Sequence, residues 1–238
     1  ACFPPISSNG RAPTSPRRWS EWPGPCTRMH SRPTASSLDA VTVDAMGTLV
    51  ELDDPAPRLR RSLAEHGVER QLDAVAAAFH AEVAYYLPRT LEGRDEESLA
   101  DLGRRCTAVF LEHAQAELDP AEFAQDFLAA IVFRPLAGAA PALDRLRQAG
   151  FVLACVSNWD VSLEGHLERA ELAGFFTEIV SSAEAGAAKP DPAVFLVTLE
   201  RLGVPPERAL HVGDGDGDRE GAAAARLAFE PVPLATLP

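Results

Sequence analysis

The chain has 238 residues, of which 46% are hydrophobic and 24% are charged, a composition typical of a soluble globular protein with one large domain or two small ones. Its formal net charge is −13; residues 1–38 carry five arginines and one glutamate, or +4, so the remaining residues carry −17. Such an acidic part argues against binding to nucleic acid or anionic membranes, and no apolar run approaches the roughly 18 residues of a membrane-spanning helix.

Residues 1–38 differ from the rest of the chain because they are rich in proline, serine and arginine and show no apolar periodicity. This composition predicts a disordered tail, and we expect the natural start of the protein to be Met29. The four cysteines form no Cys-x-x-Cys pair, which indicates reduced thiols and a cytoplasmic location.

A short β-branched run over 40–43 predicts a buried strand that ends at Asp44, and Gly47 permits a tight bend directly after it. The next part of the chain shows apolar residues at a spacing of three to four, which predicts helices joined by short loops, and hence a small bundle. The predicted helices cover residues 57–67, 71–87, 96–118 and 120–133.

After Pro135 the pattern alternates between strands and helices, which predicts a parallel sheet covered on both faces. The predicted strands cover residues 151–156, 178–181, 209–212 and 229–232, and the predicted helices cover 141–150, 163–172, 192–202 and 221–227. Ligands of such sheets bind beyond the carboxyl ends of the strands. Asp44, Ser157 and Asp214 all stand at or just after strand ends, so we expect them to lie close together.

Lys189 is the only lysine in a chain with 21 arginines. Lysine presents a compact point charge on a thin stem, whereas arginine presents a broad planar fork. A site that must hold a carboxylate or an anion at one point can therefore require lysine. Together with Asp44 and Asp214, which offer the oxygen ligands that Mg²⁺ prefers, and with Ser157 as a hydrogen-bond donor, this set suits phosphoryl transfer.

At these positions the chain resembles the haloacid dehalogenase-like superfamily of hydrolases. Four motifs carry the resemblance in the expected order: Asp44-Ala-Met-Gly-Thr-Leu, Val-Ser157-Asn158, Lys189-Pro-Asp-Pro and Gly-Asp214-Gly-Asp-Gly-Asp218. The resemblance implies an α/β fold with a Rossmann-like parallel sheet, formed by residues 39–52 and 135–238, and an inserted α-helical cap over residues 53–134.

The resemblance also implies roles for single residues. Asp44 would be the nucleophile and Lys189 would steady it, while Ser157, Asn158 and Thr48 would bind a small phosphorylated substrate. Asp44, the backbone carbonyl of Met46, Asp214 and Asp218 would hold Mg²⁺, with Asp218 either a ligand or an orienting residue. Oligomeric state is not indicated by any pattern.

One position departs from the family's phosphatases, which carry an aspartate as general acid and base two residues after the nucleophile. Here that position is Met46, and a thioether cannot carry a proton. General acid–base help contributes about 10²–10⁴-fold to rate, so we expect hydrolysis of alkyl phosphates to be impaired. Asp216 and Asp218 are the neighbouring carboxylates that could substitute.

The resemblance leaves other functions open. A 2-haloacid dehalogenase also lacks the second aspartate, but Gly213-Asp214 indicates a metal site that such enzymes do not use. A phosphonatase would need a lysine in the cap, and the cap has none. A non-catalytic protein that binds a phosphorylated ligand is the alternative from another class. Two features stay ambiguous: Trp159 and Asp160 either line the cleft or form a surface loop, and Tyr85-Tyr86 either shape a pocket or pack in the core.

Overall fold

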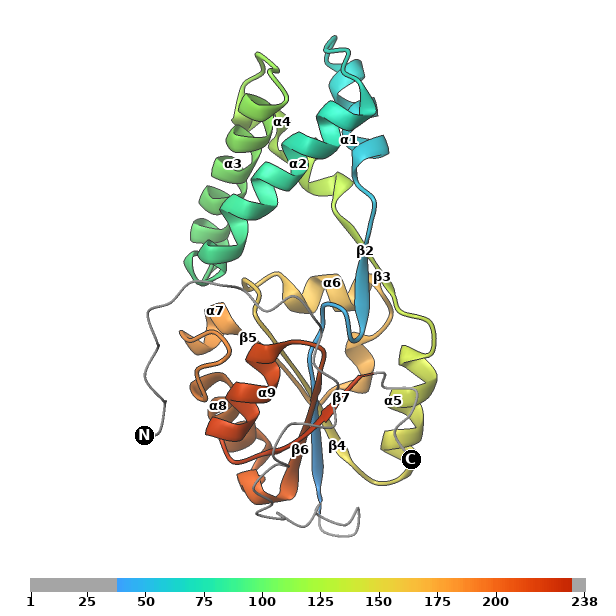
Figure 1. The fold of residues 1–238 in the computed structure, drawn as a ribbon, viewed down its shortest axis with the longest axis vertical. Helices are drawn as coiled ribbons and strands as arrows, with labels where there is room; N and C mark the ends of the chain where they lie inside the picture. Colours follow the sequence, from blue (N-terminus) through green and yellow to red (C-terminus); the bar gives the residue numbers. More distant parts are fainter. Residues whose placement is uncertain (1–37, 233–238) are drawn as a thin grey trace, which may run out of the picture. The chain divides into compact units, whose positions relative to one another are not determined.

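The computed structural model describes residues 38–232, so the expected disorder of the tail and the expected start at Met29 lie outside the described residues. Five parallel strands form the central sheet in the order β5-β4-β1-β6-β7 (Figure 1). They are β1 (Ala40–Val43), β4 (Val152–Ser157), β5 (Glu178–Ser181), β6 (Ala209–Gly213) and β7 (Ala228–Pro231). The predicted α/β class and parallel sheet are confirmed.

Helices cover both faces of this sheet, as Figure 1 shows for α5 and α8. Val41 and Val43 of β1 point into an apolar cluster beneath α5 (Ala139–Gln148) and α6 (Leu163–Arg169). Ala40 points the other way, into a cluster beneath α8 (Ala193–Leu202) and α9 (Asp216–Ala224). This alternation follows from the two-residue period of a strand. Short helices complete the layer: α7 (Ser182–Ala185), η4 (Ala173–Phe175) and η5 (Pro206–Arg208).

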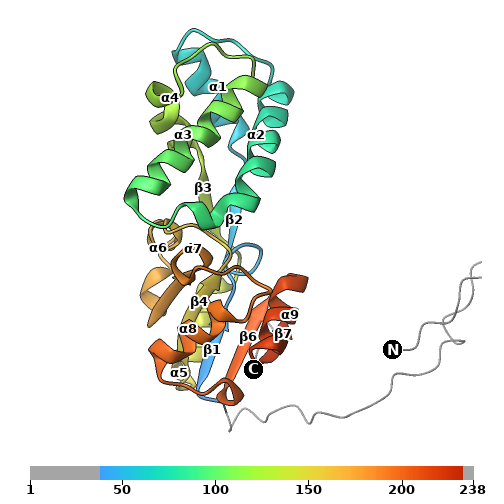
Figure 2. The ribbon, with the colours of Figure 1, turned by 90° about the vertical axis from the view of Figure 1, so that its left-hand side faces the viewer.

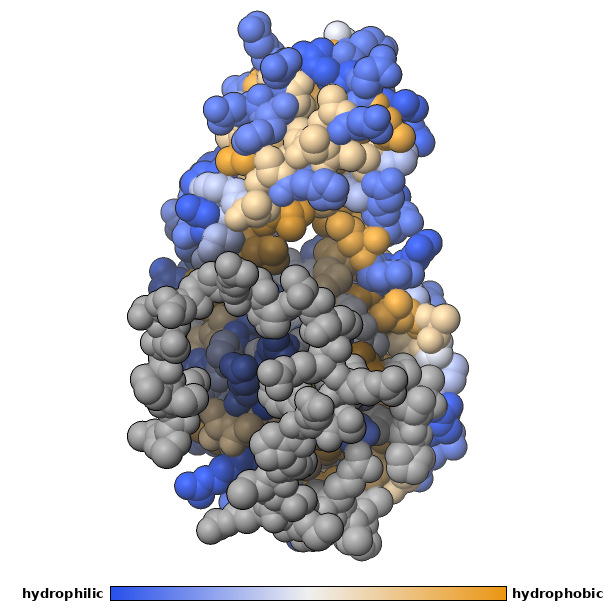
Figure 3. Space-filling view, viewed as in Figure 1, coloured by the Kyte–Doolittle hydropathy of each residue, from blue (hydrophilic) through white to orange (hydrophobic). Residues whose placement is uncertain are grey.

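Residues between β2 and β3 form a separate helical region with its own apolar core (Figure 2). It consists of α1 (Ala56–Glu65), α2 (Leu72–Tyr86), the 3-10 helix η3 (Leu87–Glu92), α3 (Glu96–His113) and α4 (Pro120–Ala130). Phe110, Phe123 and Phe127 are fully buried at the centre of this core. Hydrophilic residues cover the end of the region that lies farthest from the sheet (Figure 3).

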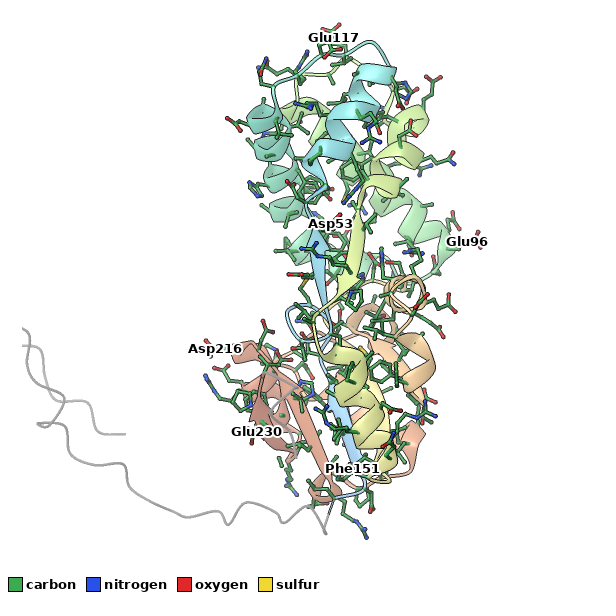
Figure 4. The ribbon with its side chains drawn as sticks, turned by 90° about the vertical axis from the view of Figure 1, so that its right-hand side faces the viewer. Asp53, Glu96, Glu117, Phe151, Asp216 and Glu230 are labelled. Atoms are coloured by element: carbon green, nitrogen blue, oxygen red, sulfur yellow. The ribbon has the colours of Figure 1, made fainter. Side chains whose placement is uncertain are left out.

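An antiparallel pair of strands, β2 (Val50–Asp53) and β3 (Val132–Pro135), connects the sheet to the helical region. The sequence prediction missed β2 and extended the last cap helix through residue 133. The structure corrects both points: Ile131 has an extended backbone, and Val132 pairs with Asp53, which Figure 4 labels in the connection. The β-branched pair Ile131-Val132 loses side-chain freedom in a helix and suits a strand.

Two helix boundaries differ from prediction by five residues each. Helix α3 ends at His113, five residues early, and the chain leaves the helix through Gln115, which has a positive φ of 53°. Helix α9 begins at Asp216 rather than at 221, because the Asp218 side chain caps its first turn by accepting from the Gly215 amide at 3.0 Å. Among residues 38–232, no helix has the length and apolar character needed to cross a membrane.

Candidate active site

The loops that follow β1, β4 and β6 meet at the carboxyl edge of the sheet. In the parallel register Val43 of β1 stands between Cys155 of β4 and Val212 of β6. The Ser157 hydroxyl donates to Asp44 Oδ1 at 2.9 Å, and the carboxylate oxygens of Asp44 and Asp214 lie within 4.8 Å of each other. The three side chains predicted to converge here are therefore brought together.

Lys189 is buried at the centre of the site, with 8% of its surface exposed. Its Nζ donates to Asp44 Oδ1 and to Asp218 Oδ1, each at 2.5 Å, and to the Val156 carbonyl at 2.9 Å. Burial alone would lower the pKa of Lys189, but the charges of the two carboxylates outweigh it and raise that pKa above its ordinary value. Lys189 is therefore a permanent cation. Each of the three N–H groups on its Nζ has an acceptor: Asp44, Asp218 and the Val156 carbonyl.

Asn158 fixes the backbone of Lys189 rather than its charge. The Asn158 amide nitrogen donates to the Lys189 carbonyl at 3.0 Å, and the Lys189 amide donates to Asn158 Oδ1 at 2.7 Å. This two-point contact locks the loop after β4 to the loop that carries the lysine. Asn158, which the resemblance assigned to substrate binding, is thus engaged with the protein itself.

Asp218 is held from three sides. Lys189 Nζ and His211 Nε2 share its Oδ1, and the Gly215 amide donates to its Oδ2. Burial would raise the pKa of Asp218, but the hydrogen bond from His211 and the charge of Lys189 bring that pKa well below its ordinary range. Because both oxygens are engaged, the geometry favours Asp218 as the residue that orients Lys189.

His211, in strand β6, was not selected from the sequence as a site residue. It is fully buried, its Nδ1 lies 2.8 Å from the Thr42 hydroxyl, and burial lowers its pKa, so that the ring is neutral. A neutral ring that accepts from Thr42 at Nδ1 carries its proton on Nε2, where it can donate to Asp218. A histidine within an apolar strand was the only signal for this contact, and it is equally typical of a structural residue.

The residues at the sheet edge suit a divalent cation. Asp44, Asp214 and Asp218 together carry −3 and Lys189 carries +1, which leaves −2. Burial and the neighbouring charge of Asp44 raise the pKa of Asp214, as expected for carboxylates that lie close together. The Thr48 hydroxyl is also buried without a hydrogen-bond partner among the described residues. Oxygen ligands with this surplus charge are what Mg²⁺ requires.

Gly47 allows Asp214 to approach the turn after β1. Its φ is +76°, a conformation that side chains disfavour, and a Cβ at this position would lie 2.3 Å from Asp214 Oδ2. Met46, one residue earlier, is 40% exposed beside Asp44. Of the two acids expected as substitutes for it, Asp218 is engaged at both carboxylate oxygens. Asp216 has a side chain that is 81% exposed and pairs with Arg219 at the surface (Figure 4).

Comparisons with known proteins find relatives named as a hydrolase and a phosphatase. The chain is 52% identical over 59 residues to haloacid dehalogenase-like hydrolase domain-containing protein 3 of Danio rerio, but this match covers only 25% of the chain and 24% of that relative. It is 31% identical over 191 residues to a phosphoglycolate phosphatase of Aquifex aeolicus, covering 79% of the chain and 81% of that protein.

A similar solved structure is that of a defluorinating L-2-haloacid dehalogenase, with a TM-score of 0.63, 27% identity, and coverage of 81% of this chain and 80% of that one. The sequence model of the family described as haloacid dehalogenase-like hydrolase matches residues 38–226. With its parallel sheet, its helical insertion and its four motifs, the chain belongs to the haloacid dehalogenase-like hydrolases.

Proposed function

We propose that this hydrolase is a Mg²⁺-dependent phosphatase that acts on a small phosphorylated metabolite through Asp44. The observation that carries the proposal is the buried Lys189 between Asp44 and Asp218, with the Asp214 carboxylate beside them. One fixed cation among three carboxylates leaves a formal charge of −2, which one divalent ion would neutralise. The phosphatase relative that covers most of the chain supports the same reaction class.

Asp44 is suited to be the nucleophile because its two oxygens are not equivalent. Ser157 and Lys189 both donate to Oδ1, and no described residue donates to Oδ2. In the proposed first step Oδ2 attacks the phosphorus, an aspartyl phosphate forms, and the electron pair of the broken P–O bond goes to the leaving oxygen. The two donors hold the carboxylate in one orientation.

Asp44 and Asp214 would hold Mg²⁺, with the backbone carbonyl of Met46 as a third protein ligand. The ion would neutralise charge on the phosphoryl oxygens. Thr48 supplies a buried hydroxyl that can donate to one of those oxygens. Asp218 orients Lys189, and the helical region acts as a cap that excludes bulk water from the loops at the sheet edge.

Met46 sets the kind of substrate. A departing alkoxide needs a proton, and Met46 has none to give. An acyl or aryl phosphate has a leaving group that departs without one, so these esters are the expected substrates. Hydrolysis of the aspartyl phosphate also benefits from a base at this position, so its slow breakdown should produce a burst of leaving group before steady turnover.

The test is a panel of acyl, aryl and alkyl phosphates assayed with Mg²⁺ on the wild type and on Met46→Asp. We expect the wild type to prefer acyl and aryl phosphates and Met46→Asp to gain about 10²–10⁴-fold on alkyl phosphates. Asp44→Asn should abolish turnover. If Met46→Asp brings no gain on alkyl phosphates, the assignment of position 46 is wrong.

Two controls separate the other functions. Halide release from a 2-haloacid without Mg²⁺ would indicate the dehalogenase reaction, which the solved relative makes worth measuring. Retained binding of a phosphorylated ligand by both wild type and Asp44→Asn, with no turnover by either, would indicate a binding protein.

A further inference from the structure

A hydrogen bond joins the helical region to the loop that carries Ser157 and Asn158. Tyr86, the last residue of α2, donates its hydroxyl to Asp160 Oδ2 at 2.9 Å. Asp160 is only 5% exposed, and it follows Asn158 by two positions. Burial and the charge of Asp160 raise the pKa of Tyr86, so its phenol keeps the proton that it donates.

A second contact lies beside the first. The Val161 amide donates to the Gly93 carbonyl at 3.0 Å, and Gly93 directly follows η3. A Cβ at position 93 would lie 2.9 Å from Asp160 Cβ, so the two backbones approach as closely as they do only because residue 93 is glycine. Tyr86 and Gly93 thus clamp residues 160 and 161 from the two ends of η3.

The clamped loop leads directly to the lysine. Asp160 Oδ1 accepts from the Ser162 amide at 2.8 Å, which fixes the turn after β4. Two residues earlier, Asn158 holds the backbone of Lys189 at both its amide and its carbonyl. Lys189 in turn holds Asp44. A continuous series of short contacts therefore runs from the end of α2 to the candidate nucleophile.

We propose that Tyr86 is a positioning residue. Its hydrogen bond to Asp160 fixes residues 158–162 and so maintains the two hydrogen bonds between Asn158 and the Lys189 backbone. Contact between the helical region and the sheet is thereby coupled to the placement of the lysine. The consequence for catalysis rests on the proposed function, whereas the structural coupling does not.

The chain provides a matched control in the neighbouring residue. The Tyr85 hydroxyl accepts from Arg105 at 3.0 Å, and the Arg89 guanidinium lies 4.0 Å from the centre of the Tyr85 ring. Both partners belong to the helical region. Tyr85→Phe and Tyr86→Phe each remove one hydroxyl from the same turn of α2, but only Tyr86→Phe removes a bond to the loop after β4.

The first arm of the test needs no substrate. Because the chain has one lysine, protein labelled with ¹⁵N-lysine gives a single backbone amide signal, that of the Lys189 N–H bonded to Asn158. Tyr86→Phe should shift this signal and speed its hydrogen exchange about tenfold or more, the effect of losing one bond to a charged acceptor. Tyr85→Phe should leave both unchanged. An unchanged signal and exchange rate in Tyr86→Phe would overturn the proposal.

The second arm measures release of phosphate from an aryl phosphate. Tyr86→Phe should lower kcat about tenfold or more while KM changes less than about twofold, and Tyr85→Phe should match the wild type. The double variant Tyr86→Phe/Asp160→Asn should have a kcat close to that of Tyr86→Phe alone, because the two residues act through one hydrogen bond. A shifted Lys189 signal with unchanged kcat would overturn the positioning role. If the wild type releases no phosphate, the proposed function fails, and the first arm still decides the structural coupling.

Discussion

Glu82 makes the stability of the helical region depend on pH. This α2 side chain is 4% exposed, and burial raises its pKa from 4.5 to about 7, against a hydrogen bond with Cys106 that lowers it. The folded protein therefore holds one more proton than the unfolded chain between these two values, so stability falls as pH rises through the window. The difference, 7 − 4.5 or about 2.5, corresponds to about 3 kcal/mol at about 1.4 kcal/mol per pKa unit.

Glu82→Gln removes this dependence because a glutamine stays neutral at every pH. Urea unfolding followed by circular dichroism at pH 5.5 and pH 8 should show the wild type losing about 2 kcal/mol more than Glu82→Gln over that interval, since part of the total loss has already occurred at pH 5.5. Every other titratable group is present in both proteins, so the difference isolates Glu82. Equal pH dependence of the two proteins would refute a raised pKa at this position.

Three further outcomes follow from the geometry. Gly47→Ala should weaken Mg²⁺ binding by at least about tenfold in a calorimetric titration, because its Cβ would displace the Asp214 carboxylate; unchanged affinity would remove Asp214 from the metal site. Lys189→Arg should lower kcat by about 10² or more in a phosphate-release assay, because a planar fork cannot place its charge at the one point where Nζ meets both carboxylates; near-normal turnover would contradict this reasoning. Phe110→Ala should cost about 3–5 kcal/mol in urea unfolding, because the ring is fully buried among other aromatic residues; a loss below about 1 kcal/mol would show that the core of the helical region tolerates the cavity.

The sheet could be predicted from the sequence because its strands are short apolar runs that end in polar residues. Such runs are buried on both faces, and the carboxyl ends of parallel strands share one edge. Asp44, Ser157 and Asp214 were therefore expected to meet, and they do. The rarity of lysine singled out Lys189, and its burial between two carboxylates agrees with that selection.

Pairings between distant residues could not be predicted in the same way. Strand β2 alternates apolar and polar residues, but over only four positions, which is too short a run to separate a strand from a loop; its partner β3 lies beyond the whole helical region in the sequence. The bond between Tyr86 and Asp160 joins residues 74 positions apart, and the sequence left each of them with two interpretations. Whether Asp218 would face a metal or Lys189 likewise depends on where the start of α9 places its oxygens, which the motif does not specify.

The central claim is that Asp44 and Asp214 hold a magnesium ion beside a buried lysine. Calorimetric titration of the wild type, Asp214→Asn and the matched surface variant Asp216→Asn with MgCl₂ tests it most directly. The account predicts that the wild type and Asp216→Asn take up one ion with similar affinity, and that Asp214→Asn binds at least about tenfold more weakly. Absence of magnesium uptake by the wild type, or equal affinity in all three proteins, would contradict it.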